Sequence, residues 1–172
     1  MPISQIVTNS IATGAVVADD LAAGAVTRAK IGYAGAVLQV VQGSYATQVS
    51  TTGAQVDTGL TATITPSSTS SKILVLAQQQ GLRKEGGSGN SRMTLQLYRG
   101  ATSLQVFDAI MWTYTSNTFR HGGFGMSWLD SPATTSPVTY KTTVAGGDGS
   151  AFAVQADGNS GSSTIILLEI AG

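Results

Sequence analysis

The chain has 172 residues, of which only 10% are charged, with nine basic and nine acidic side chains and no cysteine. This balance disfavours nucleic acid as a partner, since a nucleic-acid binder gathers Lys and Arg on one face. Without cysteine there is no disulfide, zinc ribbon or thiol catalyst. No apolar run reaches the roughly 20 residues of a membrane span, so no membrane partner is expected.

The first 34 residues form a repeat with one large apolar side chain every five residues. These side chains are Ile6, Ile11, Val16, Leu21, Val26 and Ile31. A five-residue step turns an α-helix by about 500°, and in a strand it alternates faces, so neither element gives these side chains a common face. We therefore expect an assembly arm that bends once per repeat and orders only against a partner, because alone it buries too little apolar area. The alternatives are a disordered low-complexity tail and a pentapeptide-type β-helix.

Residues 35–172 predict one all-β domain, an antiparallel β-sandwich of jelly-roll or TNF/C1q-like type. Runs rich in Val, Ile, Leu, Thr and Tyr are separated by Gly, Ser, Pro and Asp, at the spacing of sandwich strands. The expected strands are 36–42, 44–50, 60–65, 72–80, 92–99, 103–108, 110–115, 119–129, 137–144, 151–156 and 163–170.

Two of these strands are apolar at four consecutive positions, 73–76 and 165–168. A sandwich strand with one face in the core and one in water alternates instead, as 61–65 and 94–98 do. A continuous apolar run needs cover on both faces, so its outer face requires a subunit contact or a covering loop. The two runs indicate oligomerisation.

Aromatic side chains are densest between residues 111 and 128. Trp112 and Tyr114 are two residues apart and share one face of a strand, which favours packing in the core or at a subunit interface. The functional alternative is contact with a receptor by stacking. Its candidate residues are Trp112, Tyr114, Phe119 and His121. Recognition is otherwise expected in two exposed loops, 83–91 and 116–122.

No catalytic, cofactor-binding or metal-binding residues are predicted. The single histidine, His121, has no Ser or Asp motif around it, as a nucleophile–base pair would need. The carboxylates of the domain are scattered singly along the sequence, whereas glycoside cleavage needs two in close proximity. Residues 148–150 and 157–159 have oxygen ligands beside glycine but too few acidic groups for calcium, so hairpin turns explain them better. We expect no enzyme; cleavage of surface polysaccharide is the remaining catalytic alternative.

Three further segments are distinctive: TGLTATITPSSTSSKILV at 58–75, LDSPATTSPVTYK at 129–141 and GAVTRAKI at 24–31. The first two resemble segments of tail-fibre and appendage proteins of tailed bacteriophages, and the third is similar to repeats near the N-termini of such fibres. The resemblance implies a homotrimeric β-sandwich, assembled in the host cytoplasm and located in the virion. Its partners would be its own copies, other tail or capsid proteins that bind residues 1–34, and a glycan or protein of the host surface. A capsid decoration or head-fibre protein and a receptor-binding or glycan-binding tip are the alternatives.

Overall fold

The computed structural model describes residues 17, 21–23 and 25 and, further on, 34–87, 90–113, 117–147, 149–156 and 162–172, with the backbone alone for 108–113. Ten strands lie in these ranges. They are β1 (Val37–Tyr45), β2 (Val49–Thr51), β3 (Val56–Ile64), β4 (Lys72–Lys84), β5 (Ser91–Arg99), β6 (Thr102–Thr113), β7 (Phe119–Asp130), β8 (Val138–Gly146), β9 (Phe152–Val154) and β10 (Ser163–Ile170).

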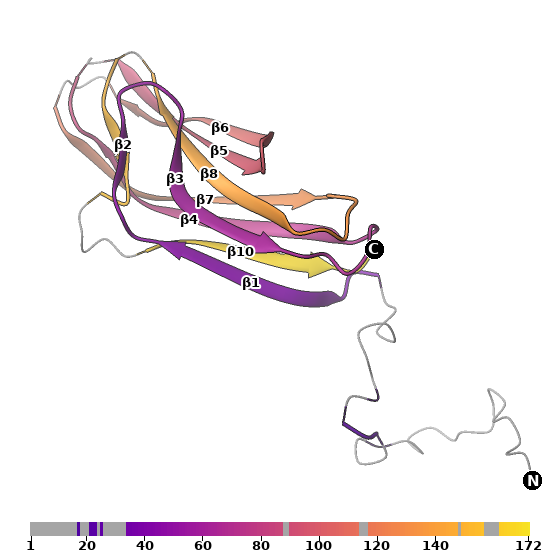
Figure 1. Cartoon of the computed structure of the whole chain (residues 1–172). Helices are drawn as coiled ribbons and strands as arrows, with labels where there is room; N and C mark the ends of the chain where they lie inside the picture. Colours follow the sequence, from indigo (N-terminus) through magenta and orange to yellow (C-terminus); the bar gives the residue numbers. More distant parts are fainter. Residues whose placement is uncertain are drawn as a thin grey trace, which may run out of the picture.

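The strands form two antiparallel sheets that pack face to face (Figure 1). In sheet A the main strands follow the order β1-β10-β4-β7, and the short strands β9 and β2 extend it beside the end of β4. Sheet B has the order β3-β8-β5-β6. The four main strands of sheet A and the four strands of sheet B follow the strand order of a jelly roll. The predicted all-β antiparallel sandwich is therefore confirmed.

The core lies between the sheets and is built from alternate residues of each strand. On β3, Ala62 and Ile64 are buried while Thr61 and Thr63 are exposed, as the period of two requires. The largest apolar side chains with less than 2% exposed surface are Leu60, Ile64, Ile73, Leu82, Met93, Leu95, Leu97, Tyr140, Phe152 and Ile165.

The two ends of the sandwich differ. At one end, the arm pole, the chain enters the domain beside its C-terminus: the Gly35 amide donates to the Ala171 carbonyl, and the Ala171 amide donates to the Ala36 carbonyl, each over 2.8 Å. The β3–β4, β5–β6 and β7–β8 connections also start and finish there. The β4–β5, β6–β7 and β8–β9 connections start and finish at the opposite end, the loop pole (Figure 1).

Two expected strand boundaries are wrong. Residues 36–42 and 44–50 were expected as separate strands, but β1 runs through Gly43 and only the short β2 follows. A Cβ on Gly43 would lie 2.1 Å from the Thr61 carbonyl oxygen. The glycine marks a close backbone approach between β1 and β3 and not a break. Likewise, 103–108 and 110–115 form the single strand β6 up to Thr113.

The two expected recognition loops are also shorter than predicted. Strand β4 continues to Lys84, whose side chain is buried, so part of 83–91 belongs to sheet A. Strand β7 begins at Phe119, which pairs with Lys84. Residues 119–122 are exposed, but on a strand. The pairing between β4 and β7 explains both differences, because their ladder continues to Lys84 and Phe119, beyond the apolar part of each strand.

Candidate assembly surfaces

The outer face of sheet A carries an apolar row that crosses four strands. Val40 pairs with Leu168, Leu168 with Leu74, and Leu74 with Leu129. Val40 is 59% exposed and Leu129 52% exposed. We call these four residues the apolar row. It lies toward the arm pole, since Val40 is near the start of β1 and Leu168 near the end of β10.

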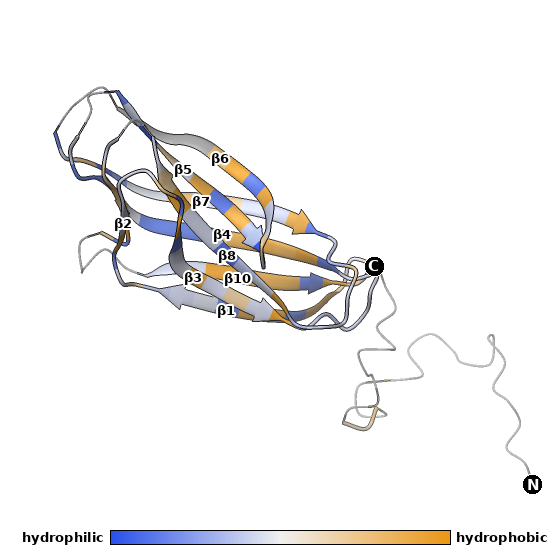
Figure 2. Ribbon diagram, turned by 45° about the horizontal axis from the view of Figure 1, so that its top comes forward, coloured by the Kyte–Doolittle hydropathy of each residue, from blue (hydrophilic) through white to orange (hydrophobic). Residues whose placement is uncertain are grey.

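Polarity rises along this face toward the loop pole. The next row contains Ile166 and Leu76 between two polar residues: Gln42, Ile166, Leu76 and Ser127. The third row has no large apolar side chain: Ser44, Thr164, Gln78 and Gly125. Figure 2 shows the same change along β4, from hydrophobic near the C-terminus to hydrophilic at the far end.

Glycines on β7 make part of this face hollow. A Cβ on Gly125 would lie 2.9 Å from Gln78 Oε1, and one on Gly123 would lie 2.6 Å from Gln80 Oε1. The two glutamine side chains therefore lie across the sheet over the glycines. A shallow depression of about 360 Å³ follows, lined by Leu76, Ala77, Gln78, Gly125, Met126, Ser127, Thr164 and Ile166. The sequence signal for it is the run Gly122-Gly123 followed by Gly125.

The continuous apolar runs predicted from the sequence contribute to this face. Alternate residues point inward, where Ile73, Val75, Ile165 and Leu167 are buried. The others, such as Leu76 with 39% exposure, point outward, and no described part of the chain covers them. Sequence reasoning missed Val40 and Leu129, because only the strand register brings them into the row.

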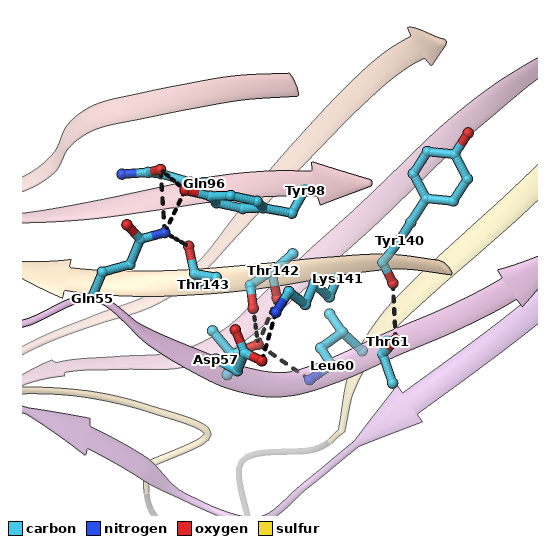
Figure 3. A network of polar contacts seen from close by, with 11 residues as sticks. Gln55, Asp57, Leu60, Thr61, Gln96, Tyr98, Tyr140, Lys141, Thr142 and Thr143 are labelled. Carbon is cyan, nitrogen blue, oxygen red and sulfur yellow. Dashed lines mark hydrogen bonds and ion pairs between the residues drawn. The ribbon is translucent and has the colours of Figure 1, made fainter. Parts of the chain in front are cut away.

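The outer face of sheet B is polar and forms its own hydrogen bonds (Figure 3). Gln55 Nε2 donates to Thr143 Oγ1 over 2.7 Å and to the Tyr98 hydroxyl over 2.9 Å. Nearby, Lys141 forms an ion pair with Asp57 over 2.8 Å. Because these polar side chains already have partners within the sheet, they have less to gain from association than the uncovered apolar side chains of sheet A.

A buried carboxylate braces the arm pole. Glu169 on β10 has no exposed surface. Its Oε1 accepts from the Ser67 amide, the Ser67 hydroxyl and the Ser71 hydroxyl over 2.6, 2.6 and 2.7 Å, and its Oε2 accepts from Gln39 Nε2 over 2.6 Å. Burial alone would raise the pKa of Glu169, but these hydrogen bonds outweigh it and lower the pKa below its ordinary value. The charged group fixes the β3–β4 connection against β1, where the arm joins.

A second buried carboxylate links the two sheets. Asp130 on β7 accepts two hydrogen bonds from Arg99, over 2.8 and 3.0 Å, and one from the Tyr140 hydroxyl over 2.6 Å. Burial, then the hydrogen bond and charge of Asp130, raises the pKa of Tyr140, so its hydroxyl stays a donor. Arg99 and Tyr140 belong to sheet B. The three side chains provide hydrogen-bond partners for one another, which is typical of a structural contact between sheets.

Only three of the predicted site residues, Leu21, Phe119 and His121, have described side chains. Leu21 of the arm is 47% exposed, whereas Ile6, Ile11, Val16, Val26 and Ile31 lie outside the described residues. Phe119, 42% exposed, and His121, also exposed, lie on β7 toward the loop pole. The side chain of Trp112 and all of Tyr114 lie outside the described part. Farther along β7, Phe124 and Trp128 pack against the core.

The described residues contain no group of three or more His, Asp or Glu side chains that could hold a metal ion. Among them there is also no helix long and apolar enough to cross a membrane. The turn containing Gly149 and Ser150 is described only in part, since Asp148, like residues 157–159, lies outside the described positions.

No family model and no curated protein matches the sequence. Among solved structures, VP2 of the infectious bursal disease virus subviral particle is 11% identical with a TM-score of 0.42, covering 76% of this chain and 37% of the VP2 chain. The Stig cyclase Fisc from Fischerella sp. TAU is 11% identical with a TM-score of 0.33, covering 66% of this chain and 57% of its own.

Bacillus endospore appendages, described as disulfide-linked pili, are 15% identical with a TM-score of 0.29, covering 77% of this chain and 89% of theirs. The chain thus spans little more than a third of VP2. A viral particle, a cyclase and a pilus have different functions, so these remote similarities do not decide between functions.

Proposed function

We propose that this chain is a structural protein of a bacteriophage virion: a homotrimeric tail-fibre or appendage subunit anchored by residues 1–34. The observation that carries the proposal is the difference between the arm pole and the loop pole of the domain. The arm enters at one pole, beside an uncovered apolar face, and connections gather at the other. A subunit of this design docks at one end and projects the other.

The mechanism of the proposed function is assembly and involves no catalysis. Each five-residue unit of the arm offers one large apolar side chain. Because these side chains alone bury too little area to order the arm, we expect the arm to order only when a complementary virion surface buries them together with the backbone between them. The fibre-like segments at 24–31, 58–75 and 129–141 support the same setting.

Incorporation into virions tests the arm. We expect the triple variant Val16→Asp, Leu21→Asp and Val26→Asp to be lost from purified particles, because it places charge at three docking positions. The control, Thr13→Asp, Ala18→Asp and Ala23→Asp, adds the same charge between the repeated positions and should still incorporate. Quantitative immunoblotting of purified virions measures both. Equal incorporation of the two variants contradicts docking through the repeat.

Location on the particle separates the fibre proposal from a capsid decoration or head-fibre protein. Immunogold labelling of the incorporated chain on the tail supports the first. Labelling on the head supports the second, with the same arm and the same self-association.

A receptor-binding or glycan-binding tip is a second candidate, favoured by Phe119 and His121. Both side chains are exposed on β7 toward the loop pole, away from the proposed anchor. Aromatic rings at such positions stack against sugars or protein. If the domain is a tip, fluorescently labelled protein should bind host cells and lose that binding in Phe119→Ala. Absence of cell binding by the intact protein contradicts this role.

A further inference from the structure

The outer face of sheet A is uncharged over an area that spans four strands. The three rows from Val40 to Gly125 contain no Asp, Glu, Lys or Arg, within a fully described part of the chain. Charged residues stand only at the ends of the face, with Lys72 at the arm pole and Arg83 and Arg120 at the loop pole. An uncharged centre with charges confined to the rim is typical of the core of a protein interface.

The polar residues on this face suit an identical partner. Near a rotation axis each side chain meets its own copy, so a charged side chain would meet a like charge. The amides of Gln78 and Gln80, on the central strand β4, carry both donors and acceptors, and each can bond to a copy of itself. The hydroxyl of Thr164, on the neighbouring β10, has the same property. A face of this composition is self-complementary.

The gradient along the face sets the orientation of the copies. An antiparallel arrangement would set the apolar row of one copy against the Gln78 row of the other and bury polar groups against hydrocarbon. A rotation axis parallel to the strands instead sets apolar row against apolar row. We propose that copies of this chain associate through the outer face of sheet A around such an axis, with all arms leaving at the same pole.

This inference rests on the proposed self-assembling function and names its contact surface. Strands about 4.8 Å apart with a rise of about 3.3 Å per residue give the face an area of roughly 400 Å². A stable interface buries about 800 Å² per partner. The face alone therefore supports weak association, and the arms, brought together at one pole, supply further contact area. Face and arm act together in holding the copies.

Cysteine cross-linking tests the orientation, since the natural chain has no cysteine. In full-length Leu74→Cys and Leu168→Cys, equivalent apolar-row residues on the central strands meet near the axis. Mild oxidation should yield a covalent dimer of twice 17.5 kDa on a non-reducing gel. Val106→Cys, at a position 47% exposed on sheet B, should stay monomeric on the gel. Cross-linking of Val106→Cys in place of the two sheet A variants overturns the assignment.

Charge substitution tests the surface without cross-linking. Leu76→Lys, at a position 39% exposed, places like charges opposite each other in the assembled form, whereas Val106→Lys changes an exposed residue of the other sheet. We expect at least tenfold weaker self-association of full-length Leu76→Lys by sedimentation, with its thermal unfolding unchanged, and no effect of Val106→Lys. Leu129→Lys, at the 52% exposed end of the apolar row, is a second variant in case Leu76→Lys fails to fold.

The outcomes separate this inference from the proposed function. If the wild-type chain is oligomeric and the Leu76→Lys and Leu129→Lys variants have the same solution mass, the contact surface is refuted and the structural role stays in place. A chain that incorporates into virions but is monomeric there would overturn the surface as well. A chain excluded from virions, yet cross-linked at Leu74→Cys, would refute the proposed function and retain the surface.

Discussion

Glu169 is a buried acid whose charge is stabilised by four hydrogen bonds. Nothing in the local sequence announces this role, because Glu169 stands in an apolar strand and its donors are about 100 or more positions away in the chain. Sequence reasoning treated it as one of several scattered carboxylates. Only the pairing of β1, β10 and β4 brings Gln39, Ser67 and Ser71 to it.

We predict that Glu169→Gln destabilises the domain by about 1–3 kcal/mol, since Gln keeps the shape but loses the charged acceptor of buried donors. Because folding lowers the pKa of Glu169, the wild-type advantage is fully present above the ordinary pKa near 4.5 and is lost as pH falls through the folded value. Urea denaturation at pH 7 and at pH 3 should show the difference from Glu169→Gln shrinking in acid.

The control for this prediction is Asp57→Asn, which removes an exposed ion pair with Lys141. Such surface pairs contribute about 0–1 kcal/mol. A loss from Asp57→Asn as large as that from Glu169→Gln at pH 7 would refute the bracing role assigned to the buried carboxylate.

At the scale of elements, hydrophobic periodicity predicted most strands, and the exceptions have specific causes. Alternation located β3 and β5, and apolar runs located β4 and β10. The predicted strand 119–129 agrees with β7, whereas the end of β4 was missed, because Gly81, Arg83 and Lys84 there continue the sheet by register and not by hydrophobicity. The jelly-roll order itself depends on pairings between distant segments, such as β1 with β10, which one sequence does not specify.

Substitution of Gly43 tests the close approach of β1 to β3. Gly43→Ala should destabilise the domain by about 1–3 kcal/mol, the range for added groups in packed sites, because its Cβ meets the Thr61 carbonyl between β1 and β3. Ser44→Ala, at the next and exposed position, is the control and should have little effect. Thermal unfolding followed by circular dichroism measures both; equal midpoints for wild type and Gly43→Ala would contradict the close approach.

For the molecule as a whole, the sequence predicted that the outer faces of the two apolar strands need cover. The structure places those faces side by side on the outside of sheet A. The apolar row and the base of the arm lie at the same pole, as the proposed assembly requires of the two features predicted separately from the sequence. The sequence did not show that polar side chains pair with one another on the outer face of the opposite sheet, which is why the proposed contact surface is on sheet A.

The mass of the full chain in solution, beside that of residues 35–172, tests self-association most directly. The shorter chain keeps all ten strands and so retains the complete core. Sedimentation equilibrium at micromolar concentration should give the full chain about three times its 17.5 kDa mass and the shorter chain a lower degree of association. A monomeric full-length chain would contradict the account.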